Sequence, residues 1–271
     1  MQLSRSARIA LRVAAGLGFA IIYVPLGLVL LNSFNPDRSA SWPPPGLTTH
    51  WWSVAWESEG ARSALWVSVK AGLGATAIAL VLGTLIAFAV ARYRFFGREA
   101  VSFVVVLPIA LPGIVTGIAL NSAFSTVLEP LGVGLGMFTV VVGHATFCIV
   151  VVFNNVVARL RRTSGTYEEA AMDLGAHTFR AFVDVTFPLV RSALVAGGLL
   201  AFALSFDEIV VTTFTAGPGV ETLPIWIFNN MTRPQQAPVV SVVAAVLVLI
   251  SVVPIYAAQR MSADTATGSR I

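Results

Sequence analysis

Two neighbouring acids, Asp207 and Glu208, carry the clearest chemical potential in this sequence, because they interrupt an apolar segment that covers residues 193–214. A carboxylate near the centre of a bilayer costs about 2.5 to 3.5 kcal/mol on insertion scales, so the pair should not face lipid. The pair could attract a cation. Neighbouring helical residues point in different directions, so only one acid can face a cavity directly, and Asp207 is the favoured one.

Other interpretations of the acids stay open. The pair could be neutralised by Lys70, the only lysine of the chain, or by a partner subunit, and it could relay protons together with His144. Lys70 lies near one end of the apolar segment 64–91 and could instead extend its ammonium group toward the membrane surface. For His144 a hydrogen bond between two helices is favoured over a proton or substrate role.

The remaining reactive residues do not form a catalytic constellation. Lys70 follows Val69, so the glycine-lysine pair of a phosphate-binding loop is missing. The three histidines are scattered and Cys148 is the single cysteine, which leaves no set of metal ligands with suitable spacing. We therefore expect a protein that is not an enzyme and that takes its energy from an ion gradient or from a partner.

The composition predicts an all-α membrane protein. Hydrophobic residues make up 56% of the 271 residues and charged residues only 11%, whereas a soluble domain has about a quarter charged. Six segments are apolar and long enough to cross a bilayer, which requires about 20 residues. They lie at about 9–31, 64–91, 101–121, 137–158, 193–214 and 239–258.

The distribution of arginines predicts the orientation of these segments. Most arginines fall in alternate loops and tails, while Arg38, Arg62 and Arg233 fall in the loops between. This asymmetry follows the positive-inside rule, places both termini in the cytoplasm and explains the net charge of +4 without a nucleic-acid partner. Three arginines before the first apolar segment resemble a secretory signal, but the segment is long enough to span, and we expect it to be retained.

Small residues and prolines predict how some segments pack. Segment 64–91 is rich in glycine and alanine, so it should pack against another helix rather than lipid. Pro108 and Pro112 should kink or interrupt the third segment. After the fifth segment, residues 223–230 are too few to span, and they predict a short interfacial or partly re-entrant helix with Trp226 as an anchor.

The longest charged interval between apolar regions is the loop 163–191. Thr166 could cap a helix whose capping-box partner is Glu169. Gly175 suits the left-handed position that ends such a helix, and Thr178 could cap a second one that reaches Pro188. We therefore expect two short helices, joined by a turn, that lie flat under the membrane.

The same loop resembles the EAA loop of the membrane subunits of bacterial ABC importers. The matching residues are Glu169, Ala170, Ala171, Asp173, Gly175, Ala176 and the run Phe187-Pro188-Leu189. Glu168 adds a second glutamate before the motif. In that family the loop docks in a cleft of the cytoplasmic ATPase, which implies that residues 168–171, 173, 175 and 176 couple the chain to ATP hydrolysis.

The stretch LSFDEIVVTTFTAGPGVETLP, together with the last segment, resembles the subunits of spermidine and putrescine importers. The resemblance implies a type I importer permease (MetI-like) fold as a single domain over residues 1–271, located in the bacterial inner membrane. It implies three partners: a dimer of ATP-binding subunits, a second homologous permease subunit and an extracytoplasmic substrate-binding protein. ATP would be bound by the partner, so this chain needs no cofactor of its own.

Within this resemblance, Asp207, Glu208, Trp226 and Lys70 are the candidates for the substrate path. An excess of acids over arginines in the predicted outer loops weakly favours a cationic substrate. Importers of 4-aminobutyrate, opines or aminophosphonates look alike in this region and stay open as alternatives. A secondary transporter driven by protons and a purely structural subunit are the two alternatives from other classes.

Overall fold

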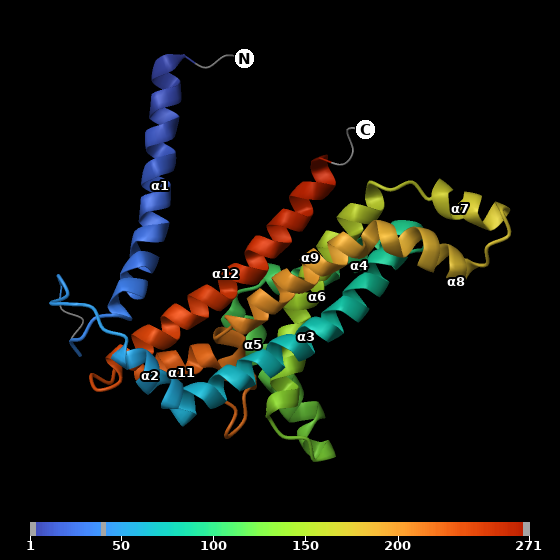
Figure 1. The fold of residues 1–271 in the computed structure, drawn as a ribbon. Helices are drawn as coiled ribbons and strands as arrows, with labels where there is room; N and C mark the ends of the chain where they lie inside the picture. The colour runs from blue at the N-terminus through green and yellow to red at the C-terminus, as the bar shows by residue number, and fades with distance from the viewer. Residues whose placement is uncertain (1–3, 39–41, 268–271) are drawn as a thin grey trace. The chain divides into compact units, whose positions relative to one another are not determined.

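The computed structural model describes residues 4–38 and 42–267, and every regular element in these ranges is a helix (Figure 1). The elements are α1 (Arg5–Asn32), α2 (His50–Glu57), α3 (Glu59–Arg92), α4 (Arg98–Ala110), α5 (Gly113–Val127), η1 (Glu129–Leu131), α6 (Met137–Arg161), α7 (Thr166–Asp173), α8 (Thr178–Ala181), η2 (Phe182–Thr186), α9 (Phe187–Phe206), α10 (Val210–Thr215), α11 (Leu223–Asn230) and α12 (Ala237–Thr267). They form two compact units. One contains the chain up to Arg62 and Ile227–Leu249, and the other contains Ser63–Trp226 and the chain from Ile250 on.

Five of the described helical segments are long and apolar enough to cross a membrane: Arg5–Asn32, Glu59–Arg92, Gly113–Leu131, Met137–Arg161 and Thr178–Phe206. The sixth predicted segment lies on α12, whose apolar part in the described chain is Ala237–Val253. The expected all-helical membrane fold is therefore confirmed.

The third and fifth predicted segments differ from continuous helices. In the third, α4 ends at Ala110 and α5 begins at Gly113, so the predicted interruption lies just before and at Pro112. The fifth segment was predicted as one helix over 193–214, but α9 ends at Phe206 and α10 begins at Val210. Asp207 and Glu208 consequently lie in a break between two helices and not along a helix face.

The first unit contains α1 and α2. α1 has no buried residue along its 28 residues, and its apolar side chains are open to the surroundings, as a lipid-facing span requires. α2 carries three tryptophans, and Trp52 stacks on Phe34 with ring centroids 5.3 Å apart. The backbone N–H of Thr48 donates to the carbonyl oxygen of Phe34 at 2.7 Å.

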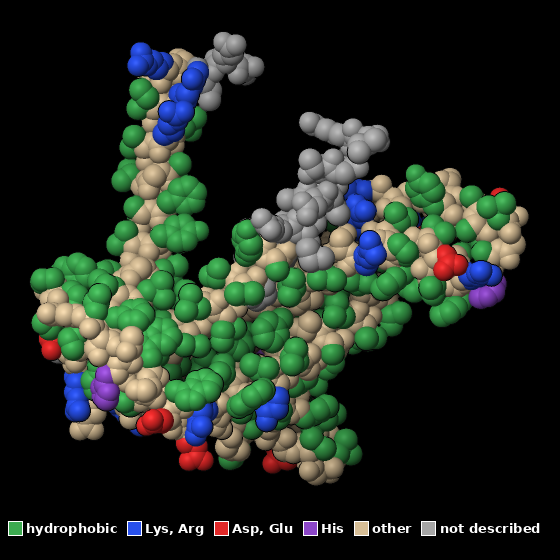
Figure 2. Space-filling view, viewed as in Figure 1, with side chains coloured by type: hydrophobic (Ala, Val, Ile, Leu, Met, Phe, Trp, Pro, Cys, Tyr) green, Lys and Arg blue, Asp and Glu red, His purple; other side chains and the backbone are tan. Residues whose placement is uncertain are grey.

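The core of the second unit lies between α3, α6 and α9. Its buried side chains include Ala79 and Val90 of α3, Val152 and Val156 of α6, and Ala201 of α9. α6 and α9 pack along each other, and Figure 1 shows them side by side. On the side of the molecule shown in Figure 2, hydrophobic side chains cover the middle of the helices, while charged side chains gather toward the helix ends.

The small residues of α3 permit its close approach to α6, as predicted. A Cβ added to Gly83 would lie 2.9 Å from the carbonyl oxygen of Ile149 and 3.0 Å from the Cβ of Val152. Close backbone approach through small residues is the usual way in which membrane helices pack, because lipid supplies no hydrophobic force between them.

Candidate functional site

The motif-bearing loop starts with α7, an exposed two-turn helix. Its acids Glu169 and Asp173 are exposed, as is Ala170, while Ala171 and Ala176 are partly covered. Gly175 has a φ of 90°, so the predicted left-handed end of this helix is confirmed. Its amide donates to the carbonyl oxygen of Met172, and the next amide donates to that of Ala171.

Both predicted caps in this loop are wrong. The residue before α7 is Gly165, and no side chain caps the helix; Thr166 instead pairs its hydroxyl with that of Ser164 at 2.8 Å. The second helix is capped by His177, whose Nδ1 accepts from the amide of Arg180 at 3.3 Å, rather than by Thr178. Several neighbouring side chains carry atoms that could accept from the free amides at these helix starts. The path of the backbone decides which of these atoms lies within hydrogen-bond distance.

The expected second short helix is the beginning of a long one. α8, η2 and α9 run without interruption from Thr178 to Phe206, with a π-helical turn at Phe182–Thr186. Pro188 has no N–H and its ring crowds the preceding turn, which favours a widened register there. Accordingly the amide of Phe187 donates to the carbonyl oxygen of Phe182, five residues back. The second half of the loop therefore continues into the fifth span as one continuous helix, which we call the long helix (Thr178–Phe206).

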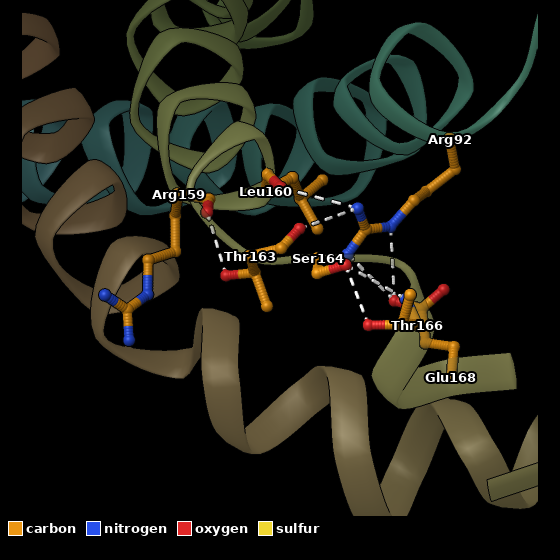
Figure 3. A network of polar contacts seen from close by, with 7 residues as sticks. All are labelled: Arg92, Arg159, Leu160, Thr163, Ser164, Thr166 and Glu168. Atoms are coloured by element: carbon orange, nitrogen blue, oxygen red, sulfur yellow. Dashed lines mark hydrogen bonds and ion pairs between the residues drawn. The ribbon is translucent and has the colours of Figure 1, made fainter. Parts of the chain in front are cut away.

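A polar anchor holds α7 against the end of α3 (Figure 3). The guanidinium of Arg92 donates from Nη2 and Nε to Glu168 Oε1 at 3.0 and 3.2 Å. Its Nη1 also donates to the carbonyl oxygens of Thr163 at 3.1 Å and Leu160 at 3.4 Å, close to the end of α6. Both side chains of this ion pair are largely covered, with exposures of 17% and 24%. Glu168, predicted as a coupling residue, is thus engaged within the chain.

Exposed hydrophobic side chains surround the acids of α7. Leu174 is 90% exposed and Phe179 is 70% exposed, and Tyr167 and Met172 are also open. Apolar side chains next to acids on an exposed turn are typical of a protein-binding surface. We call Tyr167, Glu169, Ala170, Met172, Asp173, Leu174 and Phe179 the loop face.

The second candidate region is the break between α9 and α10. Asp207 is exposed, and within the described chain its carboxylate has no hydrogen-bond or ion-pair partner. Glu208 is partly covered, and its Oε1 accepts from the amide of Val211 at 2.9 Å, which caps the first turn of α10. The two neighbouring acids thus differ: the carboxylate of Asp207 is open, and that of Glu208 holds the first turn of α10.

α10 is fixed to the helices around it. It packs against α5 and α6, and a Cβ added to Gly117 of α5 would lie 2.5 Å from the ring of Phe214. Asn121 Nδ2 donates to the carbonyl oxygen of Phe214 at 2.7 Å, and Thr139 Oγ1 donates to that of Thr215 at 2.7 Å. These contacts satisfy carbonyl groups at the end of a short helix that lipid could not satisfy.

His144 joins α6 to both sides of the break. The ring is fully buried, with Nδ1 2.7 Å from Ser205 Oγ and Nε2 2.7 Å from Thr212 Oγ1. The predicted hydrogen bond between helices is confirmed. Ser205 and Thr212 were not identified from the sequence, and the only local signal was a pair of hydroxyl residues flanking the acids.

Lys70 and Trp226 are the remaining candidates for the substrate path. Lys70 is exposed, and among the described residues it forms no ion pair, so the proposed neutralisation of Asp207 or Glu208 does not occur there. Trp226 is only 6% exposed, so its ring is buried and does not form the open interfacial anchor that was expected. α11 itself has the predicted bounds, Leu223–Asn230.

An apolar groove of about 820 Å³ lies between α3 and α9. Leu80 and Leu85 line one side and Leu194 and Phe202 line the other. Among the described residues that line the groove, only Arg191 is charged. A charged substrate would lose hydration in such a groove without gaining acidic partners. The groove therefore does not suit a cation, in contrast to the break that carries Asp207.

Comparisons with known proteins identify the family. Residues 79–264 match the family described as "Binding-protein-dependent transport system inner membrane component". The chain is 34% identical to the putrescine transport system permease protein PotI of Escherichia coli K12, over 79% of this chain and 77% of PotI. It is 33% identical to the spermidine/putrescine transport system permease protein PotC of the same strain, over 93% of each chain.

A solved structure supports the fold independently. The chain superposes with a TM-score of 0.74 on a bacterial ABC transporter involved in the import of the acidic polysaccharide alginate, covering 96% of this chain and 99% of that one at 16% identity. At that identity the likeness concerns the fold alone. The family match, the two relatives and this fold lead to one conclusion: the chain belongs to the binding-protein-dependent inner membrane components, and it is a permease subunit of a bacterial ABC importer.

Proposed function

We propose that this chain is one of two permease subunits of a polyamine importer and that it forms half of the path for putrescine or spermidine. The observation that carries the proposal is the open carboxylate of Asp207, which lies at a helix break without a partner among the described residues. A polyamine is a chain of protonated amines, and an unpaired carboxylate at a break in a membrane helix is a group that would attract it. The relatives named for putrescine and spermidine support this substrate class.

The end of α9 adds to the attraction. The last carbonyl groups of a helix lack partners within the helix and carry partial negative charge. Asp207 is the residue directly after α9, so its carboxylate and this helix end present negative charge at the same place. Glu208 is less available to the amine than Asp207, because its side chain is partly covered and its Oε1 accepts from the amide of Val211.

The loop face is proposed to dock on a cytoplasmic ATPase subunit. Glu169, Ala170, Ala171, Asp173, Gly175 and Ala176 would contribute to this docking, whereas Glu168 would act from within the chain by holding α7 on Arg92. The whole chain would then serve as a single permease domain with both termini in the cytoplasm. ATP would be bound by the ATPase partner only.

The long helix from Thr178 to Phe206 would connect the loop face to the break at Asp207. It contains 29 residues, which at about 1.5 Å per residue extend over roughly 43 Å. A rigid-body displacement of the loop face would therefore also move Asp207, the residue directly after the long helix. This coupling would let ATP binding and hydrolysis alternate the access of the acid between the two sides of the membrane.

The test is uptake by the complete importer reconstituted in proteoliposomes with its second permease subunit, ATPase and binding protein. We expect ATP-dependent uptake of labelled putrescine or spermidine, and loss of stimulated ATP hydrolysis in Glu169→Ala with the complex still in the membrane. Uptake of 4-aminobutyrate or an aminophosphonate instead of polyamines would refute the substrate. Uptake by the chain alone under a pH gradient without ATP would refute the coupling.

A further inference from the structure

A buried hydrogen-bond network, centred on a side chain of another helix, holds the break between α9 and α10 at which Asp207 lies. His144 of α6 contacts Ser205, in the last turn of α9, and Thr212, in α10, each at 2.7 Å. These two partners lie on either side of Asp207. A single side chain therefore spans the gap where the backbone leaves one helix and enters the next.

The direction of each hydrogen bond follows from the partners. The hydroxyl of Thr212 donates to the carbonyl oxygen of Glu208 at 2.9 Å, so its oxygen must accept from His144 Nε2–H. A neutral imidazole with a proton on Nε2 has an acceptor at Nδ1, which receives the hydroxyl proton of Ser205. Every polar atom of the ring is satisfied, which a fully buried imidazole requires.

The same hydrogen-bond network fixes the backbone on both sides of Asp207. Ser205 is held by His144, and Glu208 is held twice, by Thr212 through its carbonyl oxygen and by the amide of Val211 through Oε1. The amide of Asp207 donates to the carbonyl oxygen of Ala203 at 3.3 Å. The backbone around Asp207 is thus restrained on both sides, while its carboxylate has no partner among the described residues.

We propose that His144 is a positioning residue for substrate recognition: by bridging α9 and α10 it sets the place and direction in which Asp207 offers its carboxylate to an ammonium group. The substrate in this inference, an ammonium group of a polyamine, rests on the proposed function. The positioning of Asp207 by His144 rests on the hydrogen bonds alone. His144 itself is fully buried and does not touch the substrate. Its effect on transport passes through Asp207.

The first experiment measures this geometry without any substrate. In the complete importer, Asp207→Cys is labelled with a charged methanethiosulfonate reagent, and labelling is read on this chain after it is separated from its partners. The only native thiol of this chain, that of Cys148, is fully buried. We expect Thr212→Val to change the labelling rate about fivefold or more, since the loss of an accepting oxygen in a buried network frees the break. An unchanged rate would overturn the proposal.

Thr213→Val is the matched control for this measurement. Thr213 lies next to Thr212 in α10, and its hydroxyl also donates to a backbone carbonyl four residues back, that of Ile209 at 2.7 Å. Its side chain is exposed and does not contact His144. The control therefore removes the same kind of bond without touching the bridge. A labelling rate that changes equally in both variants would also overturn the proposal.

The second experiment is a double-mutant cycle on uptake of labelled putrescine per ATP hydrolysed. We expect His144→Ala and Asp207→Asn each to lower this ratio about tenfold, the effect of one lost charge-assisted hydrogen bond, and the double variant to be no worse than Asp207→Asn. His144→Gln should recover part of the ratio, because its amide can still donate to Thr212. Additive losses would show a merely structural role and contradict the proposal.

The two experiments separate this inference from the proposed function. If the wild-type importer moves no polyamine, the substrate assignment fails while the labelling rates still decide whether His144 sets the position of Asp207. If polyamines are moved and the cycle is additive, the function stands and the positioning role fails. Should His144→Ala not assemble, Ser205→Ala or Thr212→Val replaces it in the double-mutant cycle.

Discussion

Arg92, the last residue of α3, holds Glu168 in the first turn of α7 through two hydrogen bonds to the same carboxylate oxygen, at 3.0 and 3.2 Å. The two residues are 76 positions apart in the chain. The bond connects the proposed docking loop directly to a membrane-spanning helix, so the loop is held by more than its own two ends.

Removing this anchor should loosen the loop. Arg92→Ala leaves the largely covered Glu168 without its charged partner, and hydrogen bonds to charged groups contribute about 1.5 to 3 kcal/mol. We expect a lower melting temperature of the detergent-purified complex, faster proteolysis between residues 163 and 178, and weaker stimulation of ATP hydrolysis. A double-mutant cycle with Glu168→Ala should show strong coupling between the two side chains.

The matched control is the ion pair between Arg180 and Asp184 on α8 and η2. Both side chains are mostly exposed, at 72% and 60%, so Asp184→Ala should cost no more than about 0.5 kcal/mol. Equal effects at the two pairs would contradict the anchoring role of Arg92.

The left-handed turn at Gly175 should be required for the loop face. Gly175→Ala introduces a Cβ that meets no neighbouring atom within 4 Å, so its cost comes from the φ of 90° alone, about 1 to 3 kcal/mol. Gly165→Ala also meets open space, but at a φ of −65°, and should be neutral or slightly stabilising. Stimulated ATP hydrolysis and thermal stability, measured for both variants, should fall only in the first.

The close approach of α3 to α6 should tolerate no added atoms at Gly83. Gly83→Ala places a Cβ against the carbonyl oxygen of Ile149, and overpacking of this kind costs about 1 to 3 kcal/mol. In α1, Gly16→Ala meets nothing within 4 Å and should be tolerated. Thermal unfolding monitored by size-exclusion chromatography compares the two; a stable Gly83→Ala protein would show that these helices can move apart at little cost.

The two adjacent acids should differ in their effect on transport. Asp207→Asn removes the open charge and should lower polyamine uptake about tenfold or more, which corresponds to at least 1.4 kcal/mol. Glu208→Gln keeps an oxygen that can accept from the amide of Val211, so transport should stay within about threefold of wild type. The measurement is uptake of labelled putrescine and spermidine in proteoliposomes, and the reverse order of effects would move the recognition role to Glu208.

Much of this protein could be predicted from its sequence because the signals are local. Apolar length located the membrane segments, Pro112 marked the interruption of the third, and a glycine at the end of a short helix marked the turn at Gly175. The bounds of α11 followed from turn-forming residues on either side of a short apolar run. Each of these features depends on residues within a few positions of one another.

The tertiary structure decided the rest, because the deciding partners are far apart in the chain. His144 meets Ser205 and Thr212 at separations of 61 and 68 residues, and Arg92 meets Glu168 at 76. No local pattern encodes such pairs, since they depend on which helix faces pack together. The break at Asp207 has the same origin: helix propensity alone would continue through it, and the buried hydroxyls and the imidazole, which only packing brings together, stabilise the gap instead.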